Sequence, residues 1–278
     1  MSRIRLTKIS APTTASSYTT DMYYDTSLSK IAAVDGSSSP GPYTCYFGGF
    51  LTADYRAVRV LEFTANGTYI PLPGSKAAFF EAVGGGGAGG GGATSSSTAS
   101  VGGGGGGGAY SCARLTSASA NWTGSYAIAV GAGGTAGAAG AAGGNGGNSS
   151  VTNTAGTVVA AAYGGTGGPV LAAGTSITFQ AGGAGGAASS GTGDMKVDGG
   201  QGFQGVRLSG TVAWGGCGSG SLLCPEGGGG AAGATGGSAG GAATASGYGS
   251  AGGGGATLST SCVGGAGIQG IVRIWEFA

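Results

Sequence analysis

The sequence predicts an all-β protein: a small N-terminal β-hairpin module, then a β-sandwich-like domain with glycine-rich loops and left-handed helices of the polyglycine-II type. Three observations predict this fold. Of the 278 residues, 71 are glycine, and each glycine costs a helix interior about 1 kcal/mol, so no α-helix of note is expected. Only six of the glycines lie in residues 1–83, where polar and apolar residues alternate as in strands. Beyond residue 83, several tracts repeat glycine at every third position.

We expect two domains, a β module over residues 1–57 and a glycine-rich domain over residues 58–278. In the first, residues 21–25 and 30–34 read as the two strands of a hairpin, because apolar runs flank a short polar turn. In the second, short apolar segments bounded by glycine, proline or asparagine are typical of strands. They cover residues 58–64, 68–70, 76–83, 126–130, 157–160, 176–179, 206–208 and 271–275.

Glycine recurs every third residue from Gly134 to Gly146, with small residues between. This period fits extended helices of the polyproline-II type, which have no internal hydrogen bonds. Several such helices must therefore lie side by side and bond to one another. Because fixing glycine costs much entropy and few large apolar residues follow residue 83, we expect dense pairing within or across subunits, and a homotrimer.

The composition excludes several classes of function. The chain has no histidine, so a histidine-based catalytic triad or metal site is impossible. A net charge of +1, with 11 Lys and Arg, argues against nucleic-acid binding. Long uncharged stretches lack the density of Leu, Ile and Phe that a membrane span needs. We therefore expect no enzyme, no cofactor, no bound metal, no nucleic-acid partner and no membrane insertion.

The chain start is basic but no apolar stretch follows it, so we expect no signal peptide. There are five cysteines, and no two of them form a Cys-x-x-Cys pair. Cys217 and Cys224 could close a small loop, although five free, small side chains are the favoured interpretation.

The order of strands and glycine runs resembles the glycine-rich domain of bacteriophage tail-fibre proteins. The resemblance rests on Leu61 to Pro73, the strand Ala77 to Val83 running into Gly84 to Gly92, and the tract Gly102 to Leu115. The strand Tyr126 to Val130 with its Gly-Ala-Gly-Gly, and the closing stretch Gly264 to Phe277, continue it. The segment Asp194 to Glu226 has no counterpart in that pattern.

The resemblance implies a structural, adhesive virion protein, a homotrimer at or near the tail tip, made in the host cytoplasm. Residues 1–57 would attach it to other tail proteins. The glycine-rich domain would bind a bacterial surface glycan or an outer-membrane protein through distal loops.

The segment Asp194 to Glu226 is the candidate receptor-binding site. It concentrates charge beside aromatic residues in an otherwise neutral half of the chain, and such loops suit recognition of sugar or protein. A fold-closing or subunit-contact loop is the competing interpretation. The candidate contact residues are Asp194, Lys196, Asp198, Phe203, Arg207, Trp214 and Glu226.

Other functions stay open at this point. A purely structural virion component without receptor contact fits the same pattern. An ice-binding bundle would need a sustained period of three, flat Thr or Ala faces and disulfides, and the period here breaks repeatedly. An extracellular glycine-rich wall protein would need a secretion signal.

Overall fold

The structure, a computed structural model, describes residues 21–25, 30–34, 57–93, 98–230, 232–233, 247–258 and 261–278. The chain divides into two compact units, Met1–Arg56 and Ala57–Ala278. In the first unit, β1 (Asp21–Asp25) pairs antiparallel with β2 (Lys30–Val34), as the sequence predicts. Most of the expected module over residues 1–57 lies outside the described residues.

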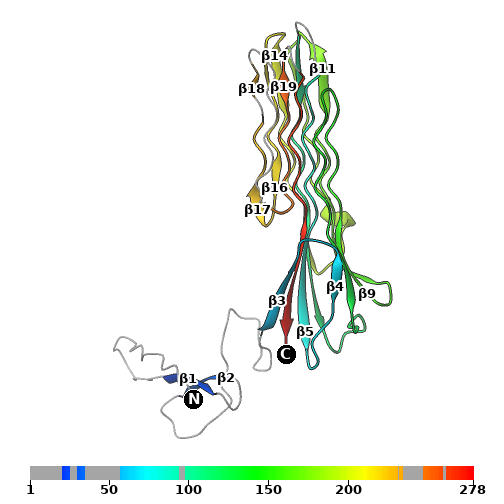
Figure 1. The fold of residues 1–278 in the computed structure, drawn as a ribbon, viewed down its shortest axis with the longest axis vertical. Helices are drawn as coiled ribbons and strands as arrows, with labels where there is room; N and C mark the ends of the chain where they lie inside the picture. The colour runs from blue at the N-terminus through cyan, green and yellow to red at the C-terminus, as the bar shows by residue number, and fades with distance from the viewer. Residues whose placement is uncertain are drawn as a thin grey trace. The chain divides into compact units, whose positions relative to one another are not determined.

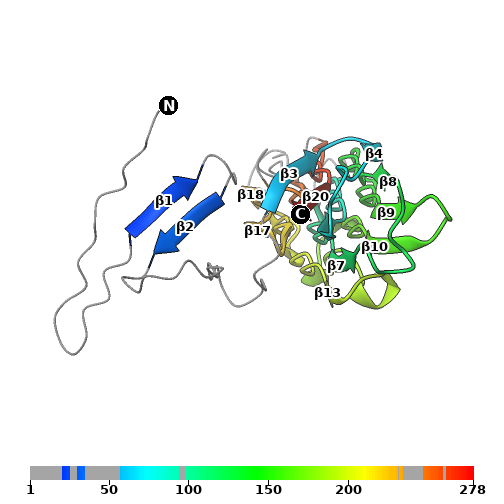
Figure 2. The same ribbon diagram turned by 90° about the horizontal axis from the view of Figure 1, so that it is seen from below.

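The second unit begins and ends in a two-layer β-sandwich, at the lower end of Figure 1. Its five-stranded sheet has the order β13 (Met195–Val197), β7 (Tyr110–Thr116), β5 (Ala77–Val83), β20 (Ile271–Phe277) and β3 (Ala57–Phe63). Its four-stranded sheet has the order β10 (Val158–Ala162), β9 (Ser149–Asn153), β8 (Tyr126–Ala129) and β4 (Gly67–Tyr69). Figure 2 shows the two layers from below.

The sandwich holds the larger of the hydrophobic cores. Alternate residues of β5, such as Ala78, Phe80 and Ala82, are fully buried against the other sheet. The rings of Phe80 and Tyr126 have centroids 5.2 Å apart, and Tyr69 packs edge-on against Phe80 at 5.8 Å. Such aromatic contacts stabilise a core beyond the area they bury.

Two smaller sheets lie at the opposite, distal end of this unit (Figure 1). One has the order β11 (Val170–Gly174), β6 (Ala99–Gly102) and β19 (Ala256–Thr257). The other, the distal sheet, has the order β12 (Thr178–Gln180), β14 (Gly205–Ser209), β15 (Val212–Trp214) and β18 (Ala232–Gly233). A separate hairpin, β16 (Ser219–Ser221) with β17 (Cys224–Glu226), and the 3₁₀ turn η1 (Ala188–Ser190) complete the elements.

Between the two ends runs a bundle of extended glycine segments, seen end-on as small coils in Figure 2. Segment 84–92 lies at its centre. Every third N–H of this segment donates to the same neighbour, so three neighbours share its donors: 103–109, 141–147 and 262–268. Its carbonyls accept from three more: 134–137, 165–168 and 252–255.

Segment 102–109 is a second centre. Its N–H groups donate to carbonyls in segments 249–255, 163–169 and 200–203. Its carbonyls accept from segment 84–90 and from two further segments, 183–186 and 216–219. Along each segment, successive N–H groups donate to different neighbours, and the same neighbour recurs at every third residue. This pattern is typical of a polyproline-II helix, which has three residues per turn.

Glycine is required because these backbones touch. A Cβ built on Gly87 would lie 2.1 Å from the carbonyl oxygen of Thr166, and one on Gly105 would lie 2.3 Å from that of Gly87. Real Cβ atoms do not approach so closely, so a methyl group would push two hydrogen-bonded segments apart. Because glycine has no side chain, neighbouring segments pack directly backbone against backbone.

The period-three tract from Gly134 to Gly146 is not one helix. It turns back at Gly140, whose φ of 72° lies in the left-handed region, and forms two adjacent segments, 131–137 and 141–147. Positive φ otherwise occurs among the described glycines only at Gly74, Gly156, Gly193 and Gly249. The remaining described glycines therefore lie at negative φ, which gives the left hand of polyproline II.

The expected strands of the second domain are confirmed, and so is the all-β class. The backbone pairing expected for the glycine tracts occurs within one chain, so this pairing does not by itself require other subunits. The homotrimer stays a prediction, supported by the resemblance alone.

One buried carboxylate links β20 to β3 and to the connection between β4 and β5. Glu276 in β20 is fully buried and accepts hydrogen bonds from the Leu72 N–H, the Ser75 hydroxyl and the Arg59 guanidinium. Burial alone would raise the pKa of this carboxyl. The hydrogen bonds from Ser75 and Leu72 and the charge of Arg59 outweigh burial and hold the pKa below its ordinary value of 4.5.

We expect Gly87→Ala to lower the melting temperature by at least about 6 °C, measured by circular dichroism. Its methyl group would meet backbone on a central segment, which costs on the order of 3 kcal/mol. The matched control is Gly229→Ala, because a Cβ there meets nothing within 4 Å. Equal melting temperatures for the two variants would show that the central segments are not in backbone contact.

We expect acid to destabilise the protein through Glu276. Because its pKa is lower in the folded state, the contribution of Glu276 is complete above its ordinary value of 4.5 and is lost as pH falls below it. Melting temperatures from about pH 6 to about pH 3 should fall less steeply for Glu276→Gln than for the parent. The variant should also melt lower at neutral pH, since it loses the Arg59 pair. Parallel curves would assign the acid sensitivity to other carboxylates.

Candidate functional site

The outer face of the distal sheet is the candidate site. In the register of the strands, Phe179 of β12 lies opposite Val206 of β14, which lies opposite Trp214 of β15. Paired residues share a face of a sheet. Phe179 is 60% exposed and Trp214 is 45% exposed, and Leu208, two residues beyond Val206, is exposed as well. We call Phe179, Val206, Leu208 and Trp214 the distal apolar face.

The inner face of the same sheet carries Arg207, which is 6% exposed. Its guanidinium donates to the carbonyl oxygens of Ala172 at 2.6 Å, Ser176 at 2.9 Å and Ala99 at 3.2 Å. A Cβ on Gly174 would lie 2.7 Å from the guanidinium, so the bare backbone of Gly174 makes room for it. Arg207 thereby joins the distal sheet to both neighbouring strands, β6 and β11.

The distal sheet therefore inverts the usual arrangement of a half-buried strand. In Val206-Arg207-Leu208, the charged residue is buried, whereas Leu208 is exposed and Val206 is half-buried. Arg207 is buried because it satisfies carbonyls that would otherwise lack donors. The exposed apolar side chains do not contribute to the stability of the isolated chain. This face is therefore a candidate for contact with another molecule.

Three of the charged residues of the predicted site lie away from the distal sheet. β13 pairs with β7 of the basal five-stranded sheet, which places Asp194, Lys196 and Asp198 at that sheet edge. Each of the three bonds to backbone. Asp194 accepts from the Arg114 N–H at 2.7 Å, Asp198 accepts from the Ala188 N–H at 2.6 Å, and Lys196 donates to the Gly191 carbonyl at 3.1 Å.

The other predicted residues divide between bundle and hairpin. Phe203 is 65% exposed on a glycine segment, and Glu226 is exposed at the end of β17. The seven predicted residues therefore do not form one site, and of them the distal sheet holds Trp214 and the buried Arg207. Cys217 and Cys224 are free thiols in the structure.

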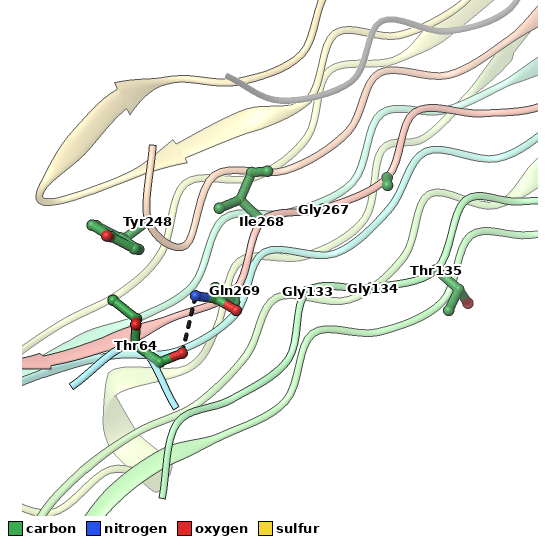
Figure 3. A pocket seen from close by; sticks show the side chains of 9 residues that line it. Thr64, Gly133, Gly134, Thr135, Tyr248, Gly267, Ile268 and Gln269 are labelled. Carbon is green, nitrogen blue, oxygen red and sulfur yellow. Dashed lines mark hydrogen bonds between the residues drawn. The ribbon is translucent and has the colours of Figure 1, made fainter. Parts of the chain in front are cut away.

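A shallow groove lies on the side of the bundle near the basal sandwich (Figure 3). Gln269 crosses it and donates to the Thr64 carbonyl at 3.0 Å. Its lining holds no carboxylate, amine, guanidinium or thiol, and its one ionisable side chain is the phenol of Tyr248. The lining residues are Thr64, Gly133, Gly134, Thr135, Tyr248, Ala266, Gly267, Ile268 and Gln269.

The part of the chain that the structure describes holds no candidate metal cluster and no candidate membrane span. Within the described residues, no three His, Cys, Asp or Glu side chains gather closely enough to hold a metal ion. In the same part of the chain, no helix has the length and apolar character to cross a bilayer.

A family model described as a glycine-rich domain matches residues 64–275. The chain belongs to this glycine-rich domain family. The match begins directly after β3 and ends within β20, so it covers the glycine bundle, the distal sheets and the basal sandwich apart from β3. No curated protein sequence matches the chain.

Sequence reasoning missed Phe179, Val206 and Leu208 as candidate contact residues. Their signal was present, because Thr178 and Arg207 each stand between two large apolar residues. The alternation predicts two faces for each strand but does not say which one meets solvent. The neighbouring strands decide this, since β6 and β11 present the carbonyls of Ala99 and Ala172 to Arg207.

We expect Arg207→Ala to destabilise the domain by about 2–4 kcal/mol, because three carbonyls lose their charged donor in a buried place. Chemical denaturation monitored by circular dichroism measures this loss. Lys196→Ala is the matched control, since its exposed ammonium bonds to a single carbonyl, and it should change stability by no more than about 0.5 kcal/mol. A similar small effect at Arg207 would contradict its role as the link between the sheets.

Proposed function

We propose that this protein is a bacteriophage tail fibre or tail-tip adhesin that binds a receptor on the host surface without catalysis. The distal apolar face is the observation that carries the proposal. It lies at one end of the glycine-rich domain, and β3, where the chain enters the domain, lies at the other (Figure 1).

The glycine bundle supports this role mechanically. Segments 84–92 and 102–109 are each hydrogen-bonded on all sides, so the distal sheet sits on a support in which the central backbone is fixed. A rigid support lowers the entropy lost when a surface binds. The proposed location on a virion rests on the resemblance of the strand and glycine pattern to tail-fibre domains.

The composition of the candidate surface favours binding over chemistry. The chain has no histidine, and Arg207, the charged residue of the distal sheet, is bound to carbonyls on the inner face. Large apolar side chains at the centre of a contact contribute much of its binding free energy. Several copies on one particle would strengthen a modest single contact through avidity.

Binding of the fluorescently labelled full chain to a panel of Gram-negative and Gram-positive bacteria tests the proposal by flow cytometry. We expect saturable binding to a subset of strains, displaced by excess unlabelled protein. Binding to no strain would overturn the adhesin and leave a purely structural role. Thermal hysteresis of the same protein in ice would instead indicate an ice-binding bundle.

A further inference from the structure

We propose that the distal apolar face recognises a protein surface with exposed apolar side chains, rather than a glycan. This inference rests on the proposed adhesin function and assigns the chemical class of its receptor. It follows from the composition, the charge and the shape of the face.

The face combines aromatic with aliphatic side chains across three adjacent strands. Phe179 and Trp214 flank Val206, and Leu208 extends the row along β14. A sugar ring stacks on an aromatic ring, whereas the branched side chains of Val206 and Leu208 offer no such platform. Mixed aliphatic and aromatic surfaces are typical of the centres of protein interfaces.

The face also lacks the charge that an anionic polysaccharide or a phosphorylated lipid headgroup requires. Phosphate and carboxylate groups are recognised chiefly by arginine and lysine. In the described residues of the distal strands, Arg207 is the one charged side chain, and it donates inward to Ala99, Ala172 and Ser176. An uncharged partner surface matches this face, since burying an unpaired charge against it would be costly.

The shape of the face points the same way. Small ligands and sugars are usually held in concave pockets that surround them. The distal apolar face is instead the outer side of a sheet and is carried on the strands β12, β14 and β15. An uncharged apolar surface on the outer side of a sheet fits contact with a protein partner.

The bulge in β14 gives this face its exposed rim. The register between β14 and β15 shifts between Arg207 and Ser209, so Leu208 has no direct partner on β15. Ser209 and Thr211 bond to each other in the tight turn that follows. The apolar row therefore ends in a polar turn, the arrangement of an apolar interface centre with a polar rim.

The test uses the full chain and a strain that binds it. The variant Phe179→Ser with Trp214→Ser removes the two large side chains of the face. The control variant Val60→Ser with Ile70→Ser removes two exposed apolar side chains of the basal sandwich, at the opposite end of the domain. Circular dichroism and melting temperature confirm that both variants fold. We expect the apparent Kd for cells to rise at least tenfold for the first variant and to stay within about twofold for the control.

Treatment of the cells identifies the receptor class. We expect digestion of surface proteins with proteinase K to abolish binding, and oxidation of surface sugars with periodate to leave it unchanged. Binding that survives proteinase K and is lost after periodate would overturn the protein receptor while the adhesin stands. Unchanged binding by the first variant would also overturn the inference, because the face would not be used.

Two further results distinguish a failure of the adhesin function from a failure of the proposed receptor class. Binding to no strain overturns the adhesin function and the inference together. Light scattering of the purified protein tests whether a second copy covers the face. A dimer that the first variant dissolves and the control retains would assign the face to self-association and overturn the inference.

Discussion

The hydrogen bond between neighbouring glycine segments is the interaction on which the rest of this structure depends. An extended segment with three residues per turn satisfies none of its own N–H or C=O groups. In segment 84–92 every N–H, and every carbonyl from Gly85 to Gly90, finds a partner on another segment, because at its glycines no Cβ keeps the backbones apart. The domain thus replaces the interlocking of side chains by close contact between backbones, and its sequence carries glycine at most of the positions where two segments touch.

The two sheet ends set the register of this bundle. The ladder between β5 and β7 pairs Val83 with Tyr110 and continues without interruption when the Gly84 N–H donates to the Ala109 carbonyl. The sandwich therefore aligns the two central segments before the glycine begins. At the other end, Arg207 ties the distal sheet to the strands that finish the bundle. At both ends, specific side-chain contacts set the register of the segments. Between the ends, the repeated glycines carry no such register information.

Ten of the twenty described strands could be predicted from the sequence, because each of these is a short apolar segment with its own boundaries. Others, such as β9 and β16, are short and mostly polar and carry no such signal. The fold-back at Gly140 could not, since nothing in a uniform period of three marks where the chain turns. The candidate site could be predicted only in part. Trp214 was found because it is aromatic, but Arg207 was assigned to the surface because charge usually faces water. Its burial depends on the carbonyls of Ala99, Ala172 and Ser176, which come together only when the domain is folded.

The backbone-filled interior has a thermodynamic consequence. Exposing apolar surface raises the heat capacity on unfolding, and exposing polar surface lowers it. The bundle buries peptide groups in place of large apolar side chains, so its unfolding carries a smaller heat-capacity change per residue than that of an ordinary domain. Its free energy of unfolding therefore varies less steeply around its maximum, and the stability of the bundle extends over a broader span of temperature, into the cold as well as the heat.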